Sequence, residues 1–271
     1  MTNAFVPVAC TLEDVIVETP TIRTFVLRPE RPIPFRAGQF VQLELPGLGE
    51  APFTPSSSPQ EPERLEITIL KTGLVTNALH ELEPGRTLGV RGPFGKGYPT
   101  QKFAGQTLLV IGGGVGLAPL RSLLYHLFAD LSPYERVSIK YGGRAPDELC
   151  FRRQHEEWVA KDKVDFTPTI DRPAVGWDGK VGLVTTLLED MDLDLEKTYA
   201  ISCGPEVMLK FVTWKLLDLG FPPERIYLSM NRNMSCGMGI CGRCNVGPYY
   251  LCKDGPDMCY ADIKDIPYAL G

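Results

Sequence analysis

The chain has 271 residues, a formal net charge of −5 and 44% hydrophobic residues, as expected for a globular protein with room for two domains. The acidic balance excludes a large nucleic-acid-binding surface, which needs a basic excess. No apolar run approaches the roughly eighteen residues that span a bilayer, and residues 1–19 lack a secretory signal pattern. We therefore expect a cytoplasmic protein without membrane or nucleic-acid partners. In that compartment clustered cysteines bind metal more readily than they form disulfides.

The first hundred residues contain short, partly alternating runs of Val, Ile, Leu, Thr and Phe, separated by turns rich in Pro, Gly and Ser. Ala78, Leu79 and Leu82 recur on one side of a single predicted helix at 76–83, with Thr76 as its N-cap. Several strands and one helix indicate a small antiparallel β-barrel, which we assign to residues 1–102. The strands are predicted at 9–19, 22–29, 39–45 and 64–71.

From Gly105 onward, strands alternate with helices, a pattern typical of a doubly wound parallel sheet. We assign this NAD(P)-type α/β domain to residues 103–230. Residues 231–271 are rich in Gly and Cys and weak in periodicity, so we expect a third, small C-terminal region. The predicted strands are 107–114, 136–144, 164–170, 198–204 and 225–230, and the predicted helices are 119–131, 148–160, 183–191 and 206–220.

Two glycine-containing turns each connect a strand to a helix. In GGGVGLAPL, residues 112–120, the glycines allow close approach of a pyrophosphate, whose charge suits a helix N-terminus. The spacing differs from G-x-G-x-x-G, so a packing turn is the alternative. SCGPEVML at 202–209 repeats the arrangement, and the ends of parallel strands line one ligand crevice. Cys203 could equally be a small buried hydrophobe.

Two further segments suit a flavin. PFTPSSSP, residues 52–59, offers an aromatic face and several hydroxyls, although a Ser/Pro-rich turn would look the same. KTGLVTNALHEL, residues 71–82, places Gly73 and Thr76 at a helix start whose exposed amides could bind phosphate. A plain capped helix is the alternative there.

The strongest motif is SCGMGICGRCNVGPYYLC, residues 235–252, in which four cysteines have the spacing C-x4-C-x2-C-x7-C. Its first three have the spacing of plant-type [2Fe–2S] ligands. The glycines between them let the loop wrap closely, with amides free to donate to sulfur. A structural zinc is the alternative, although such sites usually pair two short knuckles. We predict Cys236, Cys241, Cys244 and Cys252 as ligands, with Cys259 as the alternative fourth.

The order of these motifs resembles the ferredoxin–NADP⁺ reductase superfamily: an aromatic-Thr/Ser segment, a G-x-x-T helix start, then GGGxGxAPL, YGGR and CGP. With its cysteine loop, the chain is similar to the electron-transfer subunits of that superfamily. These include the gamma subunit of cytoplasmic NAD(P)-linked [NiFe] hydrogenases (sulfhydrogenases) and the corresponding subunits of anaerobic sulfite reductase and dihydroorotate dehydrogenase. The x7 gap and the phrase CKDGP look most like the hydrogenase gamma subunit.

The resemblance implies a role for each matching residue. Phe53 matches the aromatic that flanks the isoalloxazine ring, and Thr54 matches the hydroxyl near flavin N5. The wider flavin set comprises Ser56, Ser57, Ile69 and Lys71, with Gly73, Leu74, Val75 and Thr76 at the FAD pyrophosphate. The NAD(P) set comprises Gly113, Gly114, Val115 and Gly116 under the pyrophosphate, with Cys203, Gly204 and Pro205 beside the nicotinamide.

Two features of the sequence concern the charges that would face the phosphates of the cofactors. The family's flavin motif often reads Arg-x-Tyr-Ser/Thr, but here residues 51–54 read Ala-Pro-Phe-Thr, so that arginine is absent. Arg144 ends the predicted strand at 136–144, and no acidic residue lies between it and Asp147. An acidic side chain there would favour the NAD ribose, whereas arginine tolerates the NADP phosphate, so the sequence leans towards NADP(H) over NAD(H).

The resemblance therefore implies a flavin oxidoreductase subunit that contains FAD and a [2Fe–2S] cluster and moves electrons between NAD(P)(H) and a hetero-oligomeric partner. The expected partner supplies iron–sulfur and catalytic subunits, with a [NiFe] hydrogenase as the best match. A sulfite reductase or an electron-bifurcating ferredoxin/NAD(P) reductase is the alternative. No catalytic side chains are expected beyond the cofactors. A zinc-stabilised, non-catalytic subunit is the alternative from another class.

Overall fold

The computed structural model describes residues 4–189 and 191–270, and the chain divides into two compact units. The first unit comprises residues up to Tyr98 together with 118–126 and 231–256. The second comprises 99–117, 127–230 and the residues from Asp257 onward. The C-terminal region expected at 231–271 thus contributes to both units, with the division between Pro256 and Asp257.

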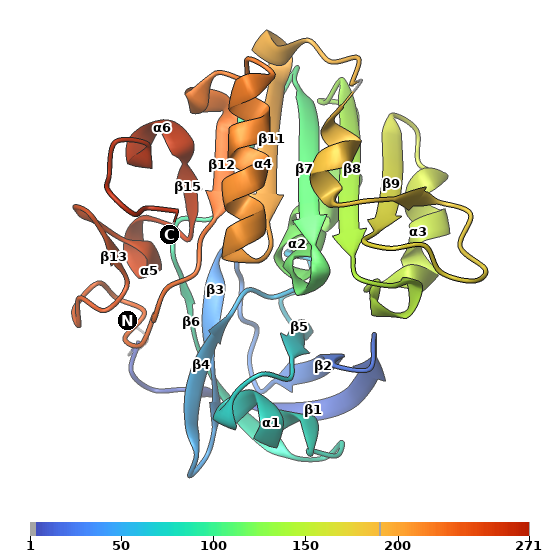
Figure 1. Ribbon diagram of the computed structural model, residues 1–271. Coiled ribbons are helices and arrows are strands. Elements are labelled where there is room, and N and C mark those ends of the chain that lie inside the picture. The colour runs from blue at the N-terminus through green and yellow to red at the C-terminus, as the bar shows by residue number, and fades with distance from the viewer. Residues whose placement is uncertain (1–3, 190, 271) are drawn as a thin grey trace. The chain divides into compact units, whose positions relative to one another are not determined.

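The first unit is built on a six-stranded antiparallel sheet that curves into a barrel, in the order β4-β3-β6-β1-β2-β5 (Figure 1). Alternate residues of β5, namely Leu65, Ile67 and Ile69, are fully buried because the period of two points them into the barrel. Leu79 of helix α1 (Leu74–His80) joins the same core. The strands are β1 (Val8–Val17), β2 (Ile22–Pro29), β3 (Phe40–Leu45), β4 (Gly49–Phe53), β5 (Leu65–Leu70) and β6 (Thr87–Phe94).

The barrel differs from the sequence prediction in two strands and one cap. Strands β4 and β6 were not expected, because glycines and a proline interrupt both and only pairing with β3 and β1 makes them strands. Helix α1 begins at Leu74 with Gly73 as its N-cap, so Thr76 is not the cap. Instead the Thr76 hydroxyl accepts hydrogen bonds from the N–H groups of Thr72 (2.9 Å) and Gly73 (2.8 Å).

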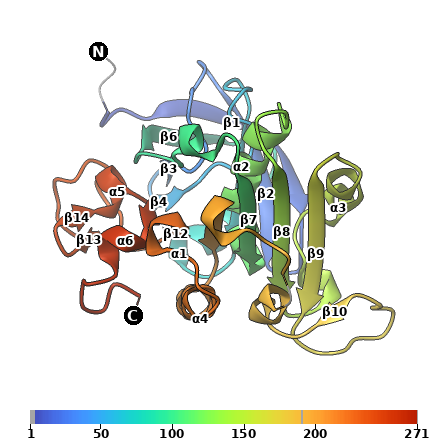
Figure 2. The same cartoon turned by 90° about the horizontal axis from the view of Figure 1, so that it is seen from above.

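The second unit contains a seven-stranded sheet in the order β10-β9-β8-β7-β11-β12-β15, parallel except for β15 at one edge. Helices α3 (Arg152–Val159) and α4 (Glu206–Asp218) lie on opposite faces of this sheet (Figure 2). This is the doubly wound arrangement that the alternating pattern predicts, so the expected fold class is confirmed. The strands are β7 (Thr107–Gly113), β8 (Arg136–Gly143), β9 (Val164–Ile170), β10 (Lys180–Val181), β11 (Thr198–Cys203), β12 (Ile226–Ser229) and β15 (Asp257–Cys259).

Shorter elements complete the chain. Helix α2 (Leu117–Phe128) follows the glycine turn after β7, and α6 (Tyr260–Ile263) follows β15. The helix expected at 183–191 is instead a 3-10 helix, Val184–Leu188, and residue 190 lies outside the described residues. The other 3-10 helices are Thr100–Phe103, Gly114–Gly116, Pro146–Glu148, Leu195–Lys197 and Pro223–Arg225.

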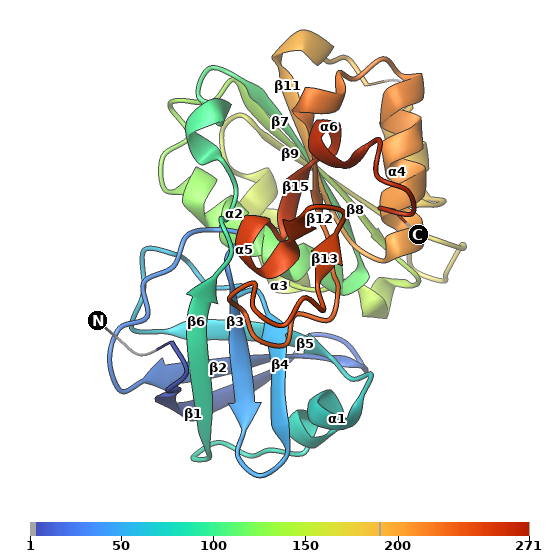
Figure 3. The ribbon, with the colours of Figure 1, turned by 90° about the vertical axis from the view of Figure 1, so that its left-hand side faces the viewer.

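The cysteine-rich segment packs within the first unit, beside the ends of β3 and β6 (Figure 3). It contains the two-stranded sheet of β13 (Asn245–Val246) and β14 (Tyr249–Tyr250), followed by helix α5 (Leu251–Asp254). The backbone N–H of Lys96, just after β6, donates to the carbonyl of Gly255 at 2.8 Å. The segment is too small to form its own core, and the barrel supplies the surface that covers it.

In the second unit, the burial of His155 can be tested through its pH dependence. Its ring lies 4.4 Å from that of Phe166, and its Nε2 lies 2.9 Å from the Cys150 carbonyl. Burial lowers the pKa of His155 from 6.5 to about 4, so the unfolded chain binds the proton more readily. Stability is therefore lost as pH falls below about 6.5.

We expect this histidine to contribute about 2 kcal/mol to the fall in unfolding free energy between pH 7 and pH 5. The measurement is urea denaturation of wild type and His155→Gln at both pH values. The variant should lose less stability on acidification than wild type. Equal pH slopes for the two proteins would contradict the burial argument.

Candidate cofactor-binding sites

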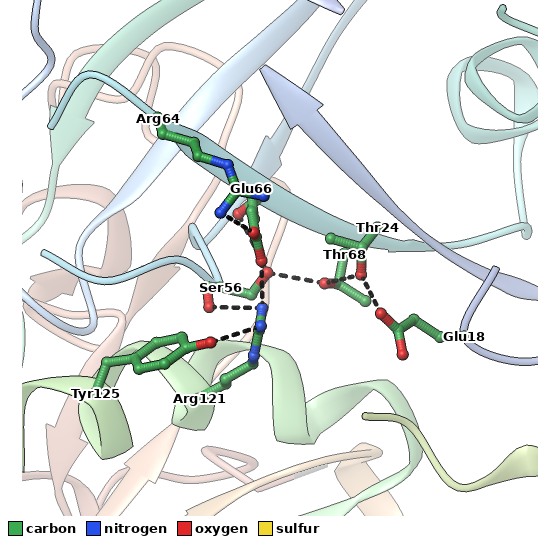
Figure 4. Close-up of polar contacts among 8 residues, drawn as sticks. All are labelled: Glu18, Thr24, Ser56, Arg64, Glu66, Thr68, Arg121 and Tyr125. Atoms are coloured by element: carbon green, nitrogen blue, oxygen red, sulfur yellow. Dashed lines mark hydrogen bonds and ion pairs between the residues drawn. The ribbon is translucent and has the colours of Figure 1, made fainter. Parts of the chain in front are cut away.

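A buried hydrogen-bond network holds the segment that follows β4 (Figure 4). The Ser56 N–H donates to the Glu66 carbonyl at 2.7 Å, and the Ser56 hydroxyl lies 2.8 Å from that of Thr68. Arg121 donates to the Ser56 carbonyl at 3.2 Å. Both the backbone and the hydroxyl of Ser56 are thus engaged by the protein.

Arg121 of helix α2 makes a buried ion pair with Glu66 of β5 at 2.5 Å, and both side chains are about 5% exposed. Its other terminal nitrogen donates to the Tyr125 hydroxyl at 2.7 Å, and the guanidinium stacks over the Tyr125 ring. The second carboxylate oxygen of Glu66 pairs with the more exposed Arg64 at 2.6 Å. A buried charge is tolerated only when paired in this way, so the pair fixes α2 next to residue 56.

The other flavin residues occupy different environments. Phe53 and Val75 are half-buried against the barrel core. Thr54, which follows Phe53 in sequence, is also half-buried. The Ser57 hydroxyl is buried and has no hydrogen-bond partner among the described residues, which leaves it available to a bound polar group. Ile69 points into the core, so its side chain does not face a ligand.

Lys71 and the start of α1 form an exposed surface. The Lys71 ammonium pairs with Glu81 at 2.8 Å, and Leu74 is 72% exposed. Gly73 adopts extended backbone before the helix. The structure therefore brings residues 71–76 together at one helix start, as the sequence predicts.

The nucleotide turn in the second unit lies against the CGP segment. Strands β7 and β11 are parallel neighbours with Gly112 opposite Cys203, so their carboxyl ends meet at one edge. A Cβ on Gly116 would lie 2.3 Å from the Cys203 carbonyl oxygen. This approach is possible only without a side chain, which explains the glycine at 116.

Two residues with no role predicted from the sequence, Tyr141 of the YGGR motif and Met208, shape this turn. The Tyr141 hydroxyl, on β8, donates to the Gly114 carbonyl at 3.0 Å and accepts from the Cys150 N–H at 2.9 Å. The Met208 sulfur lies where Cβ atoms on Gly113 and Gly204 would collide with it. A Cβ on Gly114 would meet nothing within 4 Å, so the turn is open on that side.

Cys203 is buried at the end of β11, and burial raises the pKa of its thiol to about 12. The thiol is therefore uncharged at neutral pH. Ser229 of β12 pairs with it across the sheet, and the Ser229 hydroxyl donates to Asp257 of β15. Arg144 is exposed after β8 and makes no ion pair within the described part of the chain.

The cysteine loop directs backbone amides at its own sulfurs. The N–H groups of Met238 and Ile240 each donate to Cys236 Sγ at 3.4 Å, and that of Gly239 donates to Cys252 Sγ at 3.0 Å. Burial raises the pKa of Cys236, but amide hydrogen bonds outweigh it and lower that pKa to about 6. The loop is therefore built to stabilise negative charge on sulfur.

The four cysteines of residues 236–252 influence one another. Cys241 helps to lower the pKa of Cys236, and both Cys244 and Cys236 help to raise the pKa of Cys252. Burial, followed by the Cys244 thiol, raises the pKa of Cys252 to about 12. Among residues 4–189 and 191–270, no three His, Cys, Asp or Glu side chains surround one common metal position. The Cys259 thiol instead donates to the carbonyl of Glu224 at 3.5 Å in the second unit.

Comparison with known families matches both units. The oxidoreductase FAD-binding domain family matches residues 9–98, and the oxidoreductase NAD-binding domain family matches residues 110–213. Among solved structures, that of an NADH-dependent reduced ferredoxin–NADP oxidoreductase has a TM-score of 0.75 over 98% of this chain and 94% of its own, at 23% identity. This likeness shows the same fold.

Curated relatives decide the family. The sulfhydrogenase 2 gamma subunit of Pyrococcus furiosus is 37% identical over 84% of each chain. This chain belongs to the ferredoxin–NADP⁺ reductase superfamily. A probable dihydroorotate dehydrogenase B (NAD(+)) electron-transfer subunit from Methanocaldococcus jannaschii is also 32% identical, over 92% of this chain and 88% of its own. As a superfamily member, the chain is an NAD(P)H-dependent flavin oxidoreductase with FAD- and NAD-binding domains. Every helix in the described ranges is too short or too polar to cross a membrane.

The superfamily motifs recur except for one residue, the arginine expected near residue 51, which is absent from the sequence. Arg121 of α2 instead holds the backbone at Ser56 and pairs with Glu66. Its sequence signal was a single charge within the otherwise apolar run LAPLRSLL. Tyr141 begins the YGGR motif but was assigned no role, and Met208 carried no comparable signal.

Removing one partner of the Arg121–Glu66 pair should destabilise the protein by about 3 kcal/mol, since a buried carboxylate would lose its main counter-charge. We expect Arg121→Met to lower both the unfolding free energy and the affinity for flavin. Chemical denaturation and fluorescence titration of the apoprotein with FAD measure these effects. Arg64→Met is the matched control, because Arg64 pairs with the same carboxylate from an exposed position, and it should cost less than about 1 kcal/mol.

Two glycine variants separate packing from ligand access in the nucleotide turn. Gly116→Ala should disrupt the turn, since its Cβ would collide with the Cys203 carbonyl. Gly114→Ala meets no neighbour and carries only the strain of φ +54, about 1–2 kcal/mol. We expect calorimetry to show NADPH binding weakened in both, with a large loss of thermal stability only in Gly116→Ala. Equal stability losses would contradict this geometry.

Proposed function

We propose that this chain is the electron-transfer subunit of a larger complex, which moves electrons between NAD(P)(H) and the iron–sulfur centres of a partner. The observation that carries the proposal is the presence, in one chain, of two cofactor-binding domains and a four-cysteine loop whose amides donate to sulfur. When bound, the flavin would exchange electron pairs with NAD(P)(H), and a [2Fe–2S] cluster would carry single electrons.

The flavin would be held by the residues after β4 and at the start of α1. Phe53 would flank the ring, and Thr54 would lie near its reactive edge. The Ser57 hydroxyl, which has no partner among the described residues, would satisfy one of its polar atoms. The wider set remains Ser56, Ile69 and Lys71, with Gly73, Leu74, Val75 and Thr76 at the pyrophosphate. Of these, the side chains of Ser56 and Ile69 face protein, so any contact from Ile69 would be through its backbone.

The nicotinamide nucleotide would bind across the edge where β7 and β11 end. Gly113, Gly114, Val115 and Gly116 offer backbone at the start of α2, where the helix dipole favours a pyrophosphate. Cys203, Gly204 and Pro205 would lie beside the nicotinamide, and the protonated Cys203 thiol adds no charge there. Arg144 is exposed and makes no ion pair with any described residue, which supports a preference for NADP(H), whose extra phosphate it could bind.

The cysteine loop suits a two-iron cluster better than zinc. Cys236, Cys241 and Cys244 have the C-x4-C-x2-C spacing of plant-type [2Fe–2S] ligands, whereas zinc sites usually pair two short knuckles. Cys236, Cys241, Cys244 and Cys252 are the proposed ligands. Cys259 is disfavoured because its thiol hydrogen-bonds carbonyls elsewhere in the chain.

The proposed partner is a [NiFe] hydrogenase with its own iron–sulfur subunit. The sulfhydrogenase gamma subunits support this choice, because this chain aligns with one of them over 84% of both lengths. Cys241 and Ile240 are exposed at the tip of the loop, so electrons would leave the chain there.

The ligand set predicts which cysteine is indispensable. Anaerobically purified wild type should contain FAD and about two iron atoms per chain, with an EPR signal on reduction. Cys252→Ser should lose the iron and the signal while keeping FAD, and Cys259→Ser should keep both. A colourless protein with stoichiometric zinc, or loss of iron only in Cys259→Ser, would contradict the assignment.

The partner is tested by isolating the native complex anaerobically and identifying its subunits and metals. Co-purification with nickel-containing hydrogenase subunits, and faster reduction by NADPH than by NADH, supports the proposal. Co-purification with a sulfite reductase or with a second flavin reductase would replace the hydrogenase as partner.

A further inference from the structure

A buried glutamine connects the flavin-binding strands to the cysteine loop. Gln42 lies in the middle of β3, opposite Pro52 of β4 and one residue from Val41, which pairs with Phe53. Val41 and Leu43 point into the barrel core, so the period of two directs Gln42 to the outer face. A polar side chain on that face would normally meet water, yet Gln42 is 0% exposed.

The cysteine loop covers this side chain. The Gln42 amide donates to the carbonyl of Met234 and, at 3.4 Å, to that of Ser235. Ser235 immediately precedes Cys236, the first of the proposed ligands. The two donated hydrogen bonds therefore fix the backbone at the point where the loop begins.

Neighbouring strand β6 holds both ends of the same loop. A Cβ on Gly237 would lie 2.7 Å from the Phe94 ring, so the ring packs directly on the residue after Cys236. Just beyond β6, a Cβ on Gly95 would lie 2.6 Å from the Gly255 carbonyl oxygen. The four cysteines thus lie between two contacts with adjacent strands, and Gln42 supplies the side-chain hydrogen bonds at the first.

The glutamine has an electrostatic cost that an apolar residue would avoid. Its Oε1 is buried and has no hydrogen-bond partner within the described ranges. A buried acceptor without a donor is unfavourable, and the amide cannot be reversed because both facing groups are carbonyls. The contribution of Gln42 therefore lies in its two donors to the loop.

We propose that Gln42 is a positioning residue that holds the cysteine loop against β3 and so sets the rate of electron transfer between the flavin and the cluster. The inference rests on the proposed function, which assigns the flavin to residues 53–57 and the cluster to the loop. Residues that orient the ligands of a metal centre typically affect its affinity or activity about 10–100-fold when they are replaced.

The test compares Gln42→Met with wild type and with Gln106→Met. Methionine matches glutamine in length but donates no hydrogen bonds. Gln106 accepts a hydrogen bond from Arg225 in the second unit, so its replacement removes an amide without touching the loop. Stopped-flow absorbance records flavin reduction by NADPH, and freeze-quench EPR records cluster reduction.

In Gln42→Met we expect the ratio of the cluster-reduction rate to the flavin-reduction rate to fall about tenfold. Hydrogen exchange should also become faster for backbone amides of residues 234–241, in protein both with and without iron. Gln106→Met should match wild type in both measurements. If Gln42→Met folds poorly, Gln42→Leu replaces it, because leucine also lacks the donors and the unpaired oxygen.

The outcomes distinguish a failure of the role proposed for Gln42 from a failure of the proposed function. A wild-type chain that binds no cluster overturns both. A loaded wild-type chain whose Gln42→Met variant keeps the wild-type rate ratio and the wild-type exchange overturns only the role of Gln42. A fall in all rates and in thermal stability together, with unchanged exchange in the loop, would show a merely structural residue and also overturn it.

Discussion

The buried ion pair between Glu66 and Arg121 is the interaction on which the proposed flavin segment, residues 52–59, depends. A carboxylate that is about 6% exposed cannot remain charged without a close partner. Pairing this carboxylate with Arg121 brings α2 to β5, and the Arg121 guanidinium then also reaches the Ser56 carbonyl. The backbone after β4 is thereby held before any cofactor binds, which lowers the cost of ordering the site.

The nucleotide turn follows a different constraint, the absence of side chains. Parallel pairing of β7 with β11 brings two strand ends to one edge, and their turns come so close that Gly116 has no room for a Cβ beside Cys203 and Gly204. Tyr141 then anchors the Gly114 carbonyl from β8. A Cβ on Gly114 would meet nothing within 4 Å, which leaves room at this turn for the pyrophosphate that we propose it binds.

The cysteine loop depends both on a buried polar side chain and on glycines that lack a side chain. Its glycines at 237, 239 and 242 have positive φ, which lets the chain turn its amides towards Cys236 and Cys252. Since the segment is too small to form a core, the barrel strands must hold it, and Gln42 does so from the outer face of β3. The proposed flavin site and cluster site therefore share strand β3 as a support, since β3 pairs with β4 and also binds the loop.

The sequence by itself determined the features that depend on neighbours along the chain: the alternation that buries β5, the strand–glycine–helix turns and the cysteine spacing. These are local, because periodicity and spacing fix which residue types recur on one face or in one loop. Only the tertiary structure decided that β4 and β6 are strands, that Arg121 pairs with Glu66 and binds the Ser56 carbonyl, and that Ser57 rather than Ser56 has a hydroxyl without a partner among the described residues. Gln42 belongs to the same group, since nothing near it in sequence marks it. Each of these depends on a partner many residues away, and pairing, burial and hydrogen bonding with such partners are set only when the chain has folded.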